Sequence, residues 1–422
     1  MPRRKNETPS LAKIVIGILA VCAAAFGVVR FADWFTRAPV DTTAADAQAA
    51  PPNATAEVEK LLAKGDVAGA ETLLSAVEPN AAGPRALVLL ADLDQKNGDT
   101  GAAKEKLRRA TEEFPNDPDQ PSAAAAYARF LENNGDAAAA NAIYTGLQKT
   151  APPEVRAAAL AGLAREEERK NNPGAARTHF EQAFADAPWG SGVWFEALEG
   201  LGNANVAAIF SAARTPDSRV YTVAAGDSIT SIGNKLNTTQ GLLLRANGMD
   251  DADKLRLGQN LKYTPKDFRV IVERSTCRVY LLDGTTIFNV YRTGLGKENH
   301  ETTLGRYKIG NKQKDPTWHK PGAGPIPPGD PANELGTRWM PLVPEEEGLP
   351  TDLGIHGTIQ PNSIGKYESM GCPRMHNADV EELYDLIVRS TPADVVEVFT
   401  PEILAQQPPA SAQGPEPRDP AR

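Results

Sequence analysis

The amino-acid sequence predicts a multidomain protein with an N-terminal transmembrane helix, an all-α repeat domain, a small βααβ domain and a mainly-β C-terminal domain. Three observations support this fold class. A length of 422 residues is enough for about three domains. Ala-rich helical patterns recur over residues 56–188, and alternating runs of β-forming residues begin after residue 220.

The overall composition narrows the possible function classes. With 41% hydrophobic and 23% charged residues, the chain is typical of globular proteins. The 45 basic and 54 acidic residues give a net charge of −9, which argues against a nucleic-acid partner. Three cysteines are too few for a disulfide scaffold and match no zinc-finger spacing, so we expect no metal site.

The N-terminus carries the strongest membrane signal. Residues 14–29 are uncharged, and four basic residues precede them while fewer follow closely. This pattern predicts a cytoplasmic stub and membrane anchor over residues 1–37, with the rest of the chain outside the cytoplasm. A cleaved signal peptide is the alternative, since small residues occur at 23–25. Both interpretations place the remaining domains in the periplasm or another extracytoplasmic part of the cell envelope.

A repeated helical pattern follows a predicted linker over residues 38–55. Within residues 56–188, the turns Gly65-Asp66, Gly98-Asp99 and Gly135-Asp136 recur 33 and 37 residues apart, between amphipathic segments. This arrangement resembles the tetratricopeptide repeat, which implies stacked helix–turn–helix units and a concave face that binds a protein partner. The alternative is an Ala-rich helical spacer without a specific partner.

A short module is predicted over residues 220–265, after a connector at 189–219. A β-forming run at Val220–Val223, two helical patterns and a second β-forming run ending at Tyr263 give the order strand, helix, helix, strand. Asp227 or Ser228 can cap the first helix.

The whole module resembles a LysM domain, which implies binding of N-acetylglucosamine-containing glycan through loop backbone groups. The alternative is that these loop residues only cap helices and form turns. The resemblance assigns glycan binding to Gly226, Asp227, Ser228 and Asn247.

The C-terminal region begins as a β-sheet. The runs at 268–272, 277–282 and 287–291 alternate in hydrophobicity, and Asp283-Gly284 between the last two is typical of a hairpin turn. The Pro- and Gly-rich segment 316–331 is too long for a simple connection, so we expect it to line or cover a substrate site.

The residues that carry chemistry lie near the C-terminus. His356 precedes Cys372 by sixteen residues, and Gly371 stands directly before the cysteine. These residue types suit a Cys–His nucleophilic pair, in which a nearby imidazole lowers the thiol pKa below its free value of about 8.5. Backbone N–H groups in the glycine turn can stabilise an oxyanion.

The strings around these residues resemble the L,D-transpeptidase catalytic domain of the YkuD type, over residues 268–399. Two positions depart from the usual family pattern: Met370 stands where many members have histidine, and Leu304 replaces a proline. The resemblance implies no metal and no organic cofactor. It implies Cys372 as nucleophile, His356 as general base and acid, Gly371 as the backbone group that orients the imidazole or binds the oxyanion, and Arg374, Ser369, Gly357 and Thr358 as substrate-binding residues.

The resemblance also implies a reaction. Cys372 would attack a peptidoglycan stem tetrapeptide, release D-Ala, and pass the acyl group to a neighbouring stem as a 3→3 cross-link. An L,D-carboxypeptidase, or a non-catalytic scaffold that binds peptidoglycan, is the alternative. For Arg374, a purely structural ion pair is the competing role. The Pro-rich tail, residues 400–422, is predicted to be disordered.

Overall fold

The structure is a computed structural model that describes residues 54–63, 69, 72–73, 83–319, 322 and 324–406. The chain divides into two compact units, residues 1–197 and 198–422. The predicted transmembrane segment 14–29 and the predicted turn Gly65-Asp66 lie outside the described residues. None of the helices in the described part of the chain is long and apolar enough to span a bilayer.

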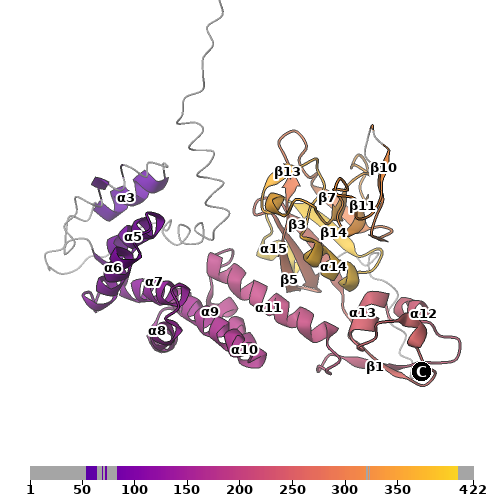
Figure 1. The fold of residues 1–422 in the computed structure, drawn as a ribbon, viewed down its shortest axis with the longest axis horizontal. Coiled ribbons are helices and arrows are strands. Elements are labelled where there is room, and N and C mark those ends of the chain that lie inside the picture. The colour runs from indigo at the N-terminus through magenta and orange to yellow at the C-terminus, as the bar shows by residue number, and fades with distance from the viewer. Residues whose placement is uncertain are drawn as a thin grey trace, which may run out of the picture. The chain divides into compact units, whose positions relative to one another are not determined.

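The first unit is built of helices that pair as hairpins, drawn from indigo to magenta in Figure 1. Helices α5 and α6, α7 and α8, and α9 and α10 pack against each other in sequence order. The bounds are Ala54–Ala63 for α3, Gly83–Lys96 for α5, Thr100–Glu112 for α6, Gln120–Asn133 for α7, Ala137–Thr150 for α8, Pro153–Arg169 for α9 and Pro173–Asp186 for α10.

Two of the predicted Gly-Asp turns connect the two helices within a hairpin, α5 to α6 and α7 to α8. Gly98 and Gly135 adopt φ angles of 84° and 87°, a region that glycine enters without steric cost. The Asp99 and Asp136 side chains then accept hydrogen bonds from the backbone of the next helix, at 2.9 and 3.2 Å. Helical hairpins are therefore confirmed here, while membership of the tetratricopeptide family stays a prediction.

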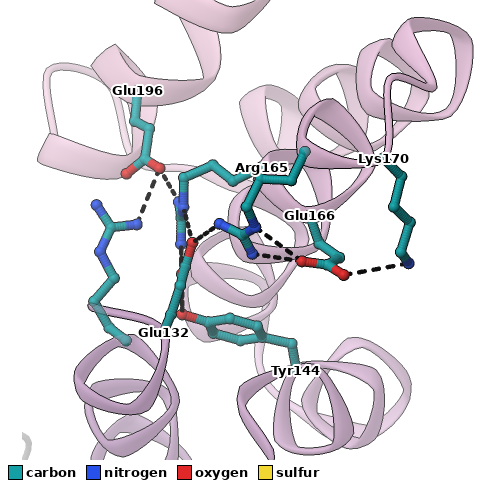
Figure 2. Close-up of polar contacts among 8 residues, drawn as sticks. Glu132, Tyr144, Arg165, Glu166, Lys170 and Glu196 are labelled. Atoms are coloured by element: carbon teal, nitrogen blue, oxygen red, sulfur yellow. Dashed lines mark hydrogen bonds and ion pairs between the residues drawn. The ribbon is translucent and has the colours of Figure 1, made fainter. Parts of the chain in front are cut away.

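A partly buried ion-pair network braces α7, α8, α9 and the start of α11 (Gly192–Phe210) (Figure 2). Glu132 accepts hydrogen bonds from Arg165 Nε at 2.8 Å, Arg169 Nη1 at 2.9 Å and the Tyr144 hydroxyl at 3.1 Å. Arg165 also pairs with Glu196. Burial alone would raise the pKa of Glu132, but these arginines lower it to about 2, so the carboxylate stays charged.

The second unit begins within α11 and continues into the predicted LysM region. Its strands β1 and β2 pair antiparallel, and Ser228 caps α12 in a reciprocal capping box with Ser231. The strand–helix–helix–strand order is confirmed. The bounds are Arg219–Thr222 for β1, Ile229–Lys235 for α12, Gln240–Arg245 for α13, Ala252–Lys254 for the 3₁₀ helix η2 and Asn260–Tyr263 for β2.

The C-terminal domain is organised around an eight-stranded sheet in the described part of the chain, with order β12-β11-β7-β14-β3-β4-β5 and β8 on β11. Strand β14 runs parallel to β3, and the other pairs are antiparallel. The bounds are Phe268–Glu273 (β3), Arg278–Asp283 (β4), Thr286–Arg292 (β5), Gly305–Ile309 (β7), Gln313–Lys314 (β8), Arg338–Pro344 (β11), Gly354–His356 (β12) and Pro392–Val396 (β14).

Smaller elements surround the main sheet. Strands β13 and β6 pair parallel, and β9 pairs with β10 inside the Pro- and Gly-rich segment. Helix α14 packs its buried leucines into the core of the sheet. The bounds are Leu295–Gly296 (β6), Trp318–His319 (β9), Pro325–Ile326 (β10), Pro361–Ser363 (η3), Tyr367–Ser369 (β13), Asn377–Leu386 (α14) and Pro401–Ala405 (α15).

The predicted LysM region has its own small core, and two of its apolar residues also pack into the core of the C-terminal domain. Leu242 and Ala246, in and just after α13, belong to the same buried cluster as the central sheet. Thr239 donates a hydrogen bond to the Asp385 carbonyl on α14, and Arg245 Nη1 lies 3.2 Å from the Asp385 carboxylate. The two modules are therefore packed together and are not joined by a free linker.

Two segments differ from the sequence expectations. The connector 189–219 contains α11, a helix of 19 residues, whose Val206 and Ile209 pack into the core of the second unit. Residues 401–405, within the tail expected to be disordered, form α15, which Thr400 caps. Residues 407–422 lie outside the described part of the chain.

Candidate functional site

The fold brings His356 and Cys372 onto adjacent backbone segments. His356 N donates to Pro373 O at 3.1 Å, and Met375 N donates to His356 O at 2.8 Å, which makes a parallel bridge between His356 and Arg374. Cys372 lies in the bend two residues before Arg374, so this bridge brings the segment that carries the thiol beside the segment that carries the imidazole. The sixteen-residue separation thus closes into one site.

The thiol and the imidazole each have another partner in the structure. Cys372 Sγ is half-buried and lies 3.7 Å from the Asp352 carbonyl oxygen. The His356 ring is buried and lies beside the Trp339 ring in a tilted arrangement, at a centroid distance of 5.7 Å. A side chain at Gly354 would collide with this indole, so the glycine lets Trp339 cover the histidine.

A backbone carbonyl orients the imidazole, but the residue differs from the expectation. His356 Nδ1 lies 2.6 Å from Gly357 O, which places the proton on Nδ1 and leaves Nε2 as the basic nitrogen. The prediction that Gly371 orients the ring is wrong. With φ at 120°, Gly371 turns its carbonyl to Thr302 Oγ1, at 2.6 Å, and its N–H donates to Ser369 Oγ.

The protonation states also differ from the expectation. Burial raises the pKa of the Cys372 thiol to about 11, against a smaller lowering by the Gly354 backbone and the Arg374 charge. Burial and the Arg374 guanidinium lower the pKa of His356 to about 4, although the Gly357 and Leu335 carbonyls favour its charged form. Burial therefore favours a neutral thiol and a neutral imidazole in the free protein.

Arg374 is the charged group next to this pair. Its side chain is about one-tenth exposed, and Nη2 lies 3.2 Å from Glu334 Oε2. Nη1 lies 3.4 Å from Gln360 Oε1, and Nε is buried without a hydrogen-bond partner among the described residues. The Arg374 carbonyl accepts from Thr293 Oγ1 at 2.7 Å, which fixes the backbone.

Comparison with known proteins identifies the family of the domain that carries this site. Residues 267–397 match the YkuD family, described as the L,D-transpeptidase catalytic domain. The chain is 31% identical over 180 residues to the L,D-transpeptidase YkuD of Bacillus licheniformis, covering 41% of this chain and 95% of that protein. It is 34% identical over 132 residues to the L,D-transpeptidase YqjB of Bacillus subtilis, covering 31% of this chain and 71% of that protein.

The chain belongs to the L,D-transpeptidase family. Members are cysteine-dependent enzymes that act on peptidoglycan, so the chain has a peptidoglycan-modifying function. Among solved structures it is similar to the Ldtfm–avibactam carbamoyl enzyme, at 21% identity and a TM-score of 0.26. That match covers 34% of this chain and 55% of the other, so the chain spans about half of its length.

Three residues predicted to bind substrate form part of the framework of the transpeptidase site. Thr358 Oγ1 accepts from Gln360 N, and Thr358 N donates to Asn377 Oδ1 at 3.1 Å. A side chain at Gly357 would collide with the same Asn377 oxygen. Ser369 Oγ holds the Gly371 amide at 3.2 Å. These contacts position the catalytic segments, and direct contact of Ser369, Gly357 and Thr358 with substrate stays a prediction.

Sequence reasoning missed the roles of Thr302, Glu334 and Trp339. Glu334 and Trp339 lie within residues 333–340, far along the chain from His356 and Cys372, and their residue types alone assign them no role at the site. Thr302 lies two residues before Leu304, and the sequence around it carries no signal for a contact with Gly371. No group of three or more metal-ligating side chains occurs within the described residues.

The glycan-binding module is confirmed as a family match, since residues 221–264 match the LysM domain, which binds peptidoglycan. The predicted contact residues have internal roles. Asp227 pairs with Lys235 and accepts from Ala224 N, and Ser228 caps α12. Asn247 bonds to both backbone groups of Lys262. Gly226, at φ 83°, forms the turn before the helix. Any glycan contact at these positions would use backbone groups.

Proposed function

We propose that this chain is a peptidoglycan L,D-transpeptidase that forms 3→3 cross-links through a thioester on Cys372. The observation that supports the proposal is the parallel bridge between His356 and Arg374, which brings the segment of Cys372 beside the histidine. Cys372 would serve as the nucleophile, His356 as the base and Arg374 as the cation that pairs with a carboxylate of the donor peptide, a set that suits acyl transfer.

The first half-reaction begins from a neutral pair. As Cys372 Sγ attacks the carbonyl of the diamino acid–D-Ala amide, its proton passes to His356 Nε2. Backbone N–H groups of the turn at Cys372 hold the oxyanion. D-Ala then leaves with the proton from His356, and a thioester remains. Proton transfer accompanies attack here because burial disfavours a free thiolate and a free imidazolium.

The second half-reaction resolves the thioester. A side-chain amine of a neighbouring stem attacks the acyl carbon, His356 takes the amine proton, and Cys372 leaves as a thiol. If water attacks in place of the amine, the same site acts as an L,D-carboxypeptidase. A double displacement of this kind predicts ping-pong kinetics.

The remaining domains suit work at the cell wall. The LysM domain holds the glycan, and the packing of Leu242 and Ala246 against the transpeptidase domain keeps the bound glycan at a constant distance from Cys372. The predicted anchor at 14–29 would keep these domains at the outer surface of the cytoplasmic membrane, in the periplasm or its equivalent. The helical hairpins, which we assign to a tetratricopeptide-like domain over residues 56–188, would bind a protein partner.

Mass spectrometry of muropeptides after incubation with the full-length chain tests the function. Cross-linked dimers support the transpeptidase, tripeptides would indicate the carboxypeptidase, and unchanged material would leave only a peptidoglycan-binding scaffold. Cys372→Ala is expected to lower product formation by roughly a thousandfold or more. Cys277→Ala, which alters a buried core cysteine, is the matched control and is expected to retain activity.

Covalent labelling gives an independent check. A carbapenem should acylate the folded chain, and the added mass should map to the peptide that contains Cys372. Label at Cys277, or no label in a chain that binds peptidoglycan, would contradict the proposed nucleophile.

A further inference from the structure

The Arg374 guanidinium is already engaged by a carboxylate in the free protein. Glu334 Oε2 lies 3.2 Å from Nη2, and the neutral Gln360 amide oxygen lies 3.4 Å from Nη1. A guanidinium has five N–H donors, and Nε–H is buried without a partner among the described residues. The group therefore has one occupied carboxylate position and spare donor capacity beside the reacting pair.

The backbone on both sides of Glu334 is held firmly. Asn333, almost fully buried, donates its amide to Pro316 O at 2.9 Å and to Pro327 O at 3.1 Å, and accepts from Leu335 N. Gly336 packs against the Thr358 backbone so closely that no side chain fits there. Glu334 is thus presented to Arg374 by a fixed segment.

The Glu334 carboxylate itself is free to leave. Its side chain is about one-third exposed, and it forms its ion pair with Arg374 in the described part of the chain. The Arg374 side chain, by contrast, is about one-tenth exposed and cannot follow it into solvent. Because a second carboxylate can take the place of the first without leaving the buried guanidinium unpaired, Glu334 can be exchanged for a carboxylate of a ligand.

We propose that Glu334 is a positioning residue that holds and neutralises Arg374 in the free enzyme, and that a carboxylate of the donor peptide replaces it when substrate binds. This inference rests on the proposed function for its substrate class. The ligand is a peptide carboxylate near the scissile amide, which either the terminal D-Ala or the diamino-acid side chain can supply.

The ion pair at Arg374 controls how strongly the guanidinium charge acts on Cys372 and His356. The Arg374 charge acts on both Cys372 and His356. The charged groups that face the thiol are Asp352, from the loop before β12, and Arg374 from its own segment, while His356 on β12 is neutral. While Glu334 is in place it screens the guanidinium. When a donor carboxylate takes over, the buried charge stays paired throughout binding.

Steady-state kinetics of Glu334→Gln tests the exchange. Removing the competing charge is expected to lower KM roughly two- to tenfold for a donor tetrapeptide with free carboxylates, with little change in kcat. Donors amidated at D-Ala or at the diamino-acid side chain distinguish the two sources, because the KM effect should vanish for the donor that lacks the pairing group. Glu334→Asp should restore wild-type behaviour in part.

Alkylation of Cys372 by iodoacetamide tests the charge effect without any turnover. At pH 8, Glu334→Gln should react about three- to tenfold faster than wild type, because the unscreened guanidinium favours the thiolate. Glu346→Gln is the matched control, since it removes the same charge from an exposed pair with Arg306. It should leave both KM and the alkylation rate unchanged.

The outcomes separate this inference from the proposed function. If Glu334→Gln behaves like Glu346→Gln in both measurements, or raises KM equally for acid and amide donors, Glu334 has only a structural role and the inference fails. If the wild type neither cross-links nor trims stems, the proposed function fails. The alkylation ratio of the two variants then still decides whether Glu334 controls the charge at Arg374.

Discussion

Burial of the His356 ring controls the protonation states that the site can adopt. Its pKa lies near 4 in the folded chain, because the ring is removed from water and Arg374 lies beside it. In an unfolded chain a histidine titrates near 6.5. The site is therefore built to keep its base neutral across the whole physiological range of pH.

This difference predicts an acid-sensitive contribution to stability. Between about pH 6.5 and 4 the unfolded chain binds a proton at His356 that the folded chain does not. The free energy of unfolding should therefore fall as the pH falls through this window, by up to about 3 kcal/mol. In His356→Gln this part of the pH dependence should disappear.

Urea unfolding of the full chain at pH 7, 5.5 and 4.5 measures the effect. The exposed His319 supplies the control, and His319→Gln should keep the wild-type slope. Equal slopes for wild type and His356→Gln would show that the ring is not kept neutral by the fold.

At the level of elements, the helical hairpins depend on small residues and on one central carboxylate. Gly162 on α9 lets the Tyr144 ring of α8 pack directly on the helix, since a side chain there would overlap the ring. Glu132 then joins three successive helices through Arg165, Arg169 and Tyr144 (Figure 2). The stacking of these hairpins is thus tied by one charged cluster and by close helix contacts.

Loss of that carboxylate should destabilise the first unit strongly. Glu132→Gln leaves the partly buried Arg165 with one carboxylate fewer, and breaking a buried pair on one side costs about 3 kcal/mol. Glu181→Gln, which breaks an exposed pair with Arg177, should cost about 0.5 kcal/mol or less. Chemical denaturation followed by helical circular dichroism compares the two variants. Similar midpoints would contradict the bracing role.

On the scale of the whole molecule, the LysM and transpeptidase domains behave as one folded body. Helix α14 begins immediately after the Cys372 segment and ends at the contact with α13. Leu242 and Ala246 of the LysM domain pack into the core of the transpeptidase domain, and this contact opposes independent movement of the two domains. The spacing between bound glycan and Cys372 is therefore a property of the fold.

Gly241 provides a sharp test of this contact. A Cβ atom there would collide with Asp385 Oδ1, so Gly241→Ala must displace Asp385 from Arg245. We expect a loss of about 1–3 kcal/mol in the free energy of unfolding. In an Asp385→Ala background most of this cost should vanish, as a double-mutant cycle would reveal.

Gly146 supplies the comparison, because a Cβ atom added at that helical position would have no neighbouring atom within 4 Å. Gly146→Ala should stabilise the chain by about 0.5–1 kcal/mol. If Gly241→Ala also stabilised the chain, the close packing of α13 on α14 would be refuted.

Local chemistry explains what could be predicted from the sequence. The turns at Gly98 and Gly135, the cap at Ser228 and the hairpin at Asp283-Gly284 each depend on backbone preferences within a few residues. The strings around His356 and Cys372 indicated the family for the same reason, since their residue types suit one kind of chemistry. These features needed no knowledge of distant contacts.

The tertiary structure alone decided which groups meet around those residues and how they are charged. The carbonyl of Gly357, not that of Gly371, orients the imidazole, and Glu334 pairs with Arg374 although it lies forty residues upstream. Asp385 accepts a hydrogen bond from Thr239 of the LysM domain. The neutral Cys–His pair likewise follows from burial, which depends on every segment packed around it. Backbone preferences act over a few residues, whereas desolvation and charge pairing act between whatever segments the fold brings together.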